Sequence, residues 1–275
     1  MTLTIAYSPC PNDTFMFDAL VHKKVSCNNI GFNVVHEDIE ELNTLASQVK
    51  ADVIKISYRH YPSVSKDYQL LTSGSALGYN CGPLLVSKNI YTAADIPNLR
   101  IAIPGINTTA NFLLSLAYPT ATNKTPVLFS DIEDVVLKGE YDAGLLIHEN
   151  RFTYAQRGLH KIMDMGVWWQ DTYHAPIPLG GICIKRSLED ATKKAVNKAL
   201  QQSVEYAFAH TDDVMPYVRA HAQAMDDNVM QQHIDLYVNR FSVDLGEEGH
   251  RAVSTMYDIA LKNKMIESIT TPIFI

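Results

Sequence analysis

The chain alternates strand-like and helix-like segments, and this alternation constrains its fold more than any other feature. Short apolar runs occur at residues 3–8, 30–38 and 51–57, and segments with helical spacing lie between them at 14–24 and 39–50. The order strand, helix, strand, helix, strand is typical of right-handed βαβ units. It therefore predicts an α/β protein with a parallel sheet.

The same pattern restarts near residue 99, so we expect two α/β domains. A chain of 275 residues is long enough for both. We expect a larger domain formed by residues 1–95 and 179–275, and a smaller one formed by residues 96–178. Open parallel sheets bind ligands beyond the carboxyl ends of their strands, so we expect a ligand cleft between the domains.

Charge and apolar content exclude several classes of partner. The formal net charge of −7 gives no electrostatic reason to bind nucleic acid or an anionic membrane. No run approaches the roughly 18 apolar residues that span a bilayer. The first residues lack the features of a signal peptide, so we expect a cytoplasmic protein whose partner is a small molecule.

Motifs for metals, disulfides and nucleotide phosphates are missing from the sequence. The cysteines are scattered without a C-x-x-C pair, and the ten histidines include no H-E-x-x-H. Neither G-x-x-x-x-G-K-S/T nor G-x-G-x-x-G occurs. The sequence therefore shows no zinc site and neither of these two phosphate-binding fingerprints.

The stretch SPCPNDTF, residues 8–15, ends the first predicted strand. Its two prolines fix φ and remove amide donors, so the strand must stop there. Asn12 or Asp13 can cap the helix that follows, whose first N–H groups could meet an anion. Asn12, Asp13 and Thr14 are therefore candidate pocket residues. The alternative is an ordinary strand–helix turn.

Lys55 lies inside the apolar strand VIKIS, where a charge is costly unless it is paired. Residues two apart on a strand face the same side, so Lys55 and Ser57 are expected to project together. At a strand end, the lysine could hold a carboxylate. The alternative is an edge lysine whose ammonium group reaches water.

The segment IPGINTTANF joins a strand end to a helix start. Gly105 permits close approach of the backbone, and Asn107, Thr108 and Thr109 surround the predicted N-cap. Capping needs only one of these side chains, so the others could hold substrate oxygens. Simple capping is the alternative.

His148 directly follows the buried strand GLLI. The unperturbed pKa of histidine, about 6.5, suits a general base, and the strand end is where a ligand is expected. Glu149 or another nearby acid could orient the ring. The alternative is a structural or surface histidine.

Taken together, these motifs resemble the 1,4-dihydroxy-6-naphthoate synthase family of the futalosine route to menaquinone. The resemblance extends over nearly the whole chain, in matching order, through SPCPNDTF, KISY, SGSALG, CGPLLV, PGINTTANFLLSL, GLLIHENRFTY and YVNRFSVDLGEEG. The family would have glycine where Asn80 stands. Asparagine tolerates the left-handed conformation better than most residues, so the turn is expected to persist.

The resemblance implies the two-domain fold of type II periplasmic binding proteins and the activity of a carbon–carbon lyase. It implies that cyclic dehypoxanthinyl futalosine is converted to 1,4-dihydroxy-6-naphthoate and dihydroxyacetone without a cofactor. It assigns the catalytic base to His148. It assigns substrate contacts to Lys55, Ile56, Ser57, Thr108 and Thr109.

Three other functions are compatible with the same fold. A solute-binding protein would need a signal peptide or lipid anchor, which the sequence does not show. A sister enzyme, such as the chorismate dehydratase of the same pathway, would act on a different substrate. A regulatory ligand-binding domain would normally come with a helix-turn-helix.

Overall fold

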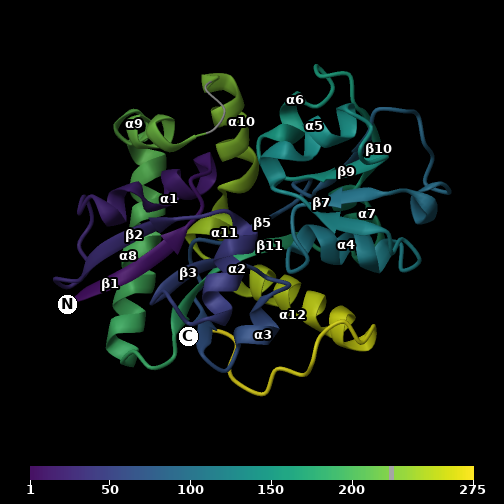
Figure 1. Ribbon diagram of the computed structural model, residues 1–275. Helices are drawn as coiled ribbons and strands as arrows, with labels where there is room; N and C mark the ends of the chain where they lie inside the picture. Colours follow the sequence, from purple (N-terminus) through teal and green to yellow (C-terminus); the bar gives the residue numbers. More distant parts are fainter. Residues whose placement is uncertain (223–225) are drawn as a thin grey trace. The chain divides into compact units, whose positions relative to one another are not determined.

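In the computed structural model, which describes residues 1–222 and 226–275, the chain forms two compact units. The first unit contains residues 1–78 and 178–275, and the second contains residues 79–177 (Figure 1). Residues 79–95, which the sequence analysis assigned to the larger domain, thus belong to the second unit. The reason is that a strand within them pairs with two later strands of that unit.

The sheet of the first unit has the strand order β2-β1-β3-β11-β4, with β5 paired to β11. Its strands are β1 (Thr2–Tyr7), β2 (Gly31–His36), β3 (Val53–Ser57), β4 (Tyr68–Leu70), β5 (Ala76–Gly78) and β11 (Ile177–Lys185). β1 runs parallel to β2 and β3, as the alternation predicts.

The predicted parallel arrangement is wrong for β11, which runs antiparallel to β3 and β4. β11 enters from the second unit rather than through a crossover helix. Because parallel neighbours need a crossover connection and no such helix leads into β11, this strand can pair antiparallel.

Helix packing builds the core of the first unit. Its helices are α1 (Pro11–Val21), α2 (Ile39–Ser47), α3 (Tyr61–Val64), α8 (Asp190–Ala209), α9 (Thr211–His221), α10 (Asp227–Tyr237), α11 (Arg240–Val243) and α12 (Gly246–Lys262). α1 packs against α8, α9 and α10. In this core the rings of Tyr7 and Phe17 stack with centroids 4.2 Å apart, beside the buried side chains of Ile5 and Leu200.

The second unit is built on a five-stranded sheet of order β10-β6-β9-β7-β8. Its strands are β6 (Leu84–Ser87), β7 (Ile101–Ile103), β8 (Lys124–Pro126), β9 (Ala143–Leu146) and β10 (His160–Asp164). β7 is parallel to β8 and β9, whereas β6 is antiparallel to β9 and β10. The parallel neighbours β7 and β9 carry the two strand ends of this sheet that concern the site.

Four helices and two short 3₁₀ turns complete the second unit. They are α4 (Thr109–Ala117), α5 (Ile132–Leu137), α6 (Asn150–Thr153), α7 (Met165–Tyr173) and the turns Ile96–Asn98 and Phe129–Asp131. Its core includes Leu84, Ala102, Ile132 and Leu146.

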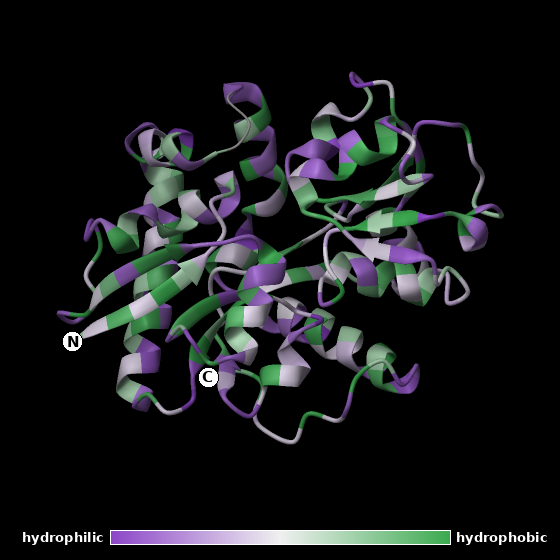
Figure 2. Ribbon diagram, viewed as in Figure 1, coloured by the Kyte–Doolittle hydropathy of each residue, from purple (hydrophilic) through white to green (hydrophobic). Residues whose placement is uncertain are grey.

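Burial explains why the internal strands read as continuous apolar runs. Every residue of β3 and of β9 is buried, as expected for strands covered on both faces. Figure 2 shows the hydrophobic residues gathered on the strands of each unit. Among residues 1–222 and 226–275, no helix combines the length and apolar character needed to span a bilayer.

Candidate functional site

The turn that follows β1 directs an acidic side chain back toward the end of that strand. α1 begins with Pro11 at its first position, and its N-cap is Cys10, whose side chain makes no capping bond. The expectation that Asn12 or Asp13 caps this helix is therefore wrong. Instead, the Asp13 carboxylate accepts a hydrogen bond of 2.7 Å from the Ser8 hydroxyl.

Asp13 has a second buried partner in Lys55 of β3. The Nζ atom of Lys55 lies 2.6 Å from Oδ1 of Asp13, and the two residues are 4% and 1% exposed. β3 pairs with β1 on one side and β11 on the other, so Lys55 is not an edge lysine that reaches water. Gly180 of β11 makes room for it, because a Cβ there would lie 2.9 Å from Cε of Lys55.

Ile56 and Ser57 complete this strand, and both are buried. The backbone N–H of Ser57 donates to Oδ1 of Asn43 over 3.0 Å, and Nδ2 of Asn43 donates to the Ser57 hydroxyl over 3.2 Å. Asn43 thereby holds the end of β3 through both the oxygen and the nitrogen of its side-chain amide. The Ser57 hydroxyl accepts here and can donate its own proton to a substrate oxygen.

His233 of α10 is a buried member of the same cluster that the sequence analysis missed. Its Nε2 lies 2.8 Å from Oδ1 of Asn12, and Nδ2 of Asn12 donates to Oδ1 of Asp13 over 2.8 Å. A carboxylate only accepts hydrogen bonds, which fixes the orientation of the Asn12 amide. His233 therefore donates to Asn12. Thr14 is also buried and donates to the Cys10 carbonyl over 3.0 Å.

Thr108 and Thr109 stand at the start of α4, at the end of β7. Thr108 is the N-cap: its hydroxyl accepts from the backbone N–H of Asn111 over 3.2 Å and donates to the Gly105 carbonyl over 2.8 Å. Both threonines are buried, whereas Asn107 is partly exposed. Capping thus accounts for the Thr108 hydroxyl but not for that of Thr109.

His148 lies two residues beyond the end of β9 in the left-handed backbone region, with φ of 58°. This conformation is uncommon for a residue other than glycine, and residues held in it concentrate at functional sites. The ring packs edge-on against Phe129, with centroids 4.7 Å apart. Burial raises the pKa of the adjacent Glu149 carboxyl. That Glu149 orients the ring stays a prediction.

Asn80 also adopts the left-handed conformation, with φ of 56°, as expected for an asparagine in place of glycine. Its carbonyl oxygen accepts a hydrogen bond of 3.2 Å from Arg151, three residues after His148. The turn that contains Asn80 is therefore linked to the segment that carries the candidate base.

The four cysteines are buried free thiols: Cys10, Cys27, Cys81 and Cys183. Burial raises the pKa of Cys81 to about 12, so this thiol is not a nucleophile near neutral pH. Within either unit by itself, no three histidine, cysteine, aspartate or glutamate side chains among the described residues lie close enough together to bind a metal ion. The absence of a metal or cofactor stays a prediction.

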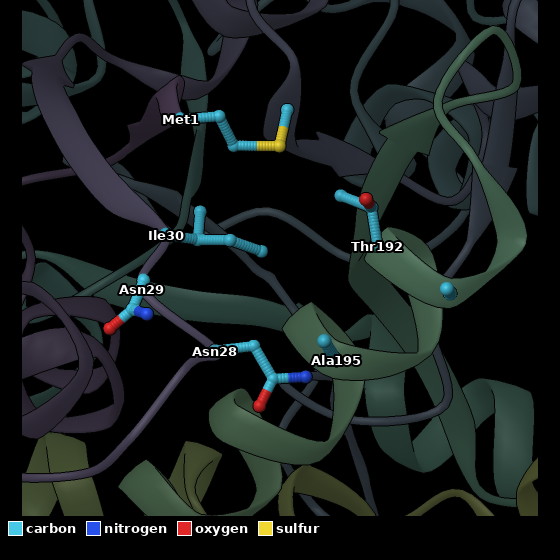
Figure 3. Close-up of a pocket in the computed structure, with 7 residues that line it drawn as sticks. Met1, Asn28, Asn29, Ile30, Thr192 and Ala195 are labelled. Carbon is cyan, nitrogen blue, oxygen red and sulfur yellow. The ribbon is translucent and has the colours of Figure 1, made fainter.

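A shallow pocket of the first unit lies away from the predicted residues. It is lined by the loop before β2 and by the first turns of α8 (Figure 3): Met1, Asn28, Asn29, Ile30, Ala191, Thr192 and Ala195. None of the residues that the sequence analysis singled out lines it. Since this loop precedes β2, the pocket lies at the amino end of that strand, whereas the candidate residues lie at or beyond strand carboxyl ends.

Comparison with known sequences gives matches over the full length of the chain. A family model described as menaquinone biosynthesis matches residues 3–262. A protein of Thermus thermophilus named 1,4-dihydroxy-6-naphtoate synthase is 42% identical over 273 residues, which cover 99% of each chain. A Streptomyces coelicolor protein of the same name is 41% identical over 273 residues, covering 98% of this chain and 96% of that protein.

Comparison with solved structures supports the fold. The crystal structure of protein AF1704 from Archaeoglobus fulgidus aligns with a TM-score of 0.91 at 32% identity, covering 96% of this chain and 98% of that one. The periplasmic aliphatic sulphonate binding protein SsuA of Escherichia coli aligns with a TM-score of 0.69 at 11% identity, covering 100% and 92%. The expected fold, that of periplasmic binding proteins, is therefore confirmed.

Proposed function

Because the chain belongs to the menaquinone biosynthesis family and is an enzyme, we propose that it catalyses the reaction for which its curated relatives are named, the formation of 1,4-dihydroxy-6-naphthoate. The full-length match to these synthases carries the proposal. The finer assignment is that cyclic dehypoxanthinyl futalosine is cleaved to this naphthoate and dihydroxyacetone. The protein is then a carbon–carbon lyase.

We assign the role of general base to His148. Its imidazole removes a proton from the carbon beside a ketone of the substrate, and the electron pair of that C–H bond moves onto the ketone oxygen as an enolate. When the enolate oxygen returns this pair, the ketone re-forms and a new C=C bond forms in the ring. The carbon–carbon bond to the sugar-derived fragment breaks at the same time, and its electron pair leaves with the fragment as a carbanion that takes up a proton. Aromatisation of the remaining ring makes the cleavage favourable.

The start of α4 is suited to hold negative charge as it develops. A helix N-terminus carries a partial positive charge and presents backbone N–H groups. Thr108 donates its hydroxyl proton to Gly105, so we assign substrate contact to its backbone and to the side chain of Thr109. Donors fixed in advance stabilise an oxyanion more than mobile water does, because they need not reorganise during the reaction.

In the first unit, Lys55, Ile56 and Ser57 are proposed as substrate contacts. The ammonium group of Lys55 is neutralised by Asp13, so a substrate carboxylate would be its second anionic partner rather than its first. Ser57 is the more direct donor, because its hydroxyl accepts from Asn43 and can donate onward. Asn12, Asp13 and Thr14 then act by holding Lys55 and the start of α1.

The test is incubation of the purified protein with cyclic dehypoxanthinyl futalosine, with the naphthoate followed by absorbance and both products by mass. Equal amounts of naphthoate and dihydroxyacetone are expected. Binding without turnover would overturn the proposal in favour of a solute-binding role. A parallel incubation with chorismate serves as control, and its dehydration would place the chain with a sister enzyme instead.

A further inference from the structure

Arg151 joins three segments of the second unit through one guanidinium group. It donates to the carbonyl oxygens of Gly82 and Asn80, the latter over 3.2 Å, and forms an ion pair of 3.4 Å with Oδ2 of Asp164. Its side chain is only 12% exposed. A guanidinium in this setting acts as a rigid planar fork, which a flexible ammonium group cannot reproduce.

The groups that Arg151 binds belong to one rigid support. The other carboxylate oxygen of Asp164 caps α7, accepting from the backbone N–H of Gly166 over 2.9 Å and of Val167 over 3.2 Å. Gly82 and Gly166 pack backbone to backbone, since a Cβ on Gly82 would lie 2.1 Å from the Gly166 nitrogen. The Asn80–Gly82 turn therefore cannot move without moving the start of α7.

The segment that carries His148 needs such support. The left-handed backbone is strained for a residue other than glycine, so the surroundings must hold it in place. The following helix, α6, has four residues and is too short to be stable alone. α6 contacts the rest of the unit through the side chain of Arg151 and through a 3.2 Å hydrogen bond from Nδ2 of Asn150 to Glu133.

We propose that Arg151 is the positioning residue of the reaction: it fixes the strained turn of His148 onto the platform formed by Asn80, Gly82 and Asp164, and so aims the imidazole. This inference rests on the proposed function, in which His148 is the base. Arg151 touches neither substrate nor reacting atoms in this role. Its loss should therefore lower the rate of the chemical step more than it weakens binding.

The test compares R151M and R151K with R100M. Arg100 pairs with Asp142 over 2.8 Å just before β7 and β9, at the opposite end of the same sheet, so R100M removes a more exposed arginine–aspartate ion pair away from His148. R151M should lower kcat about tenfold or more with KM within about twofold, and R151K should fall between. R100M should keep the wild-type kcat. Wild-type kcat in R151M, or an equal loss in R100M, overturns the inference.

A second readout separates this inference from the proposed function. If the wild-type protein does not turn over the substrate, the proposed function fails. The inference is then decided by the ring resonance of His148 in histidine-labelled protein, assigned with H148Q. That resonance should shift in R151M and not in R100M, and an unchanged resonance refutes the positioning role. If R151M does not fold, kcat and the His148 resonance are measured in R151K instead.

Discussion

Lys55 and Asp13 form an ion pair that water scarcely reaches, with Nζ 2.6 Å from Oδ1 and side chains 5% and 2% exposed. Removing one partner leaves a buried charge, which typically costs about 3–5 kcal/mol. K55M should therefore lower the free energy of unfolding in urea by about that amount.

The matched control for this prediction is the double variant K55M/D13N, which removes both charges. It should recover a large part of the stability lost in K55M, because no uncompensated charge remains. If K55M alone unfolds like the wild type, the buried pair does not stabilise the first unit as described.

Thr108 and Thr109 should respond differently to substitution. T108A removes the cap of α4 and should lower stability by about 1 kcal/mol, whereas T108S keeps the hydroxyl and should not. T109V preserves the shape of the side chain and should instead raise KM. Thermal unfolding and steady-state kinetics of the three variants distinguish the two roles, and a KM unchanged in T109V removes Thr109 from the substrate contacts.

Stability should fall in mild acid because of His60. Burial lowers the pKa of this histidine from 6.5 to about 4, and its Nε2 lies 2.9 Å from the Ser47 hydroxyl. The folded state therefore favours the neutral ring. The contribution of His60 to the free energy of unfolding is complete above pH 6.5 and is lost as the pH falls from there toward 4. The loss amounts to about 3 kcal/mol.

Urea unfolding at a series of pH values tests this, with H60Q as the comparison. The difference in unfolding free energy between wild type and H60Q should shrink as the pH falls through this window. A difference that stays constant from pH 7 to 4 would show that His60 does not titrate in this way.

Local patterns predicted the elements that position the site better than they predicted its contacts. The apolar runs before SPCPNDTF and around Lys55 indicated β1 and β3, because strands buried on both faces consist mostly of apolar residues. The left-handed turn at Asn80 was also expected, because the resemblance implies glycine at this position and asparagine tolerates that conformation, and the structure confirms it.

Contacts between residues far apart in the sequence could not be predicted from these local patterns. Asp13 was interpreted as a helix cap, yet it pairs with Lys55, 42 residues away. His233, 221 residues from Asn12, offered no local signal at all. The four-residue strand β6 was assigned to the wrong unit for a similar reason, since only its pairing with β9 and β10 places it.

The most direct test of the account is the steady-state kinetics of H148A on cyclic dehypoxanthinyl futalosine. His160→Ala is the matched control, since it removes an exposed histidine from the same unit. Loss of a general base should reduce kcat by ~10²–10⁴-fold while KM changes little, and H160A should match the wild type. A wild-type kcat in H148A would contradict the assignment of His148 as the base.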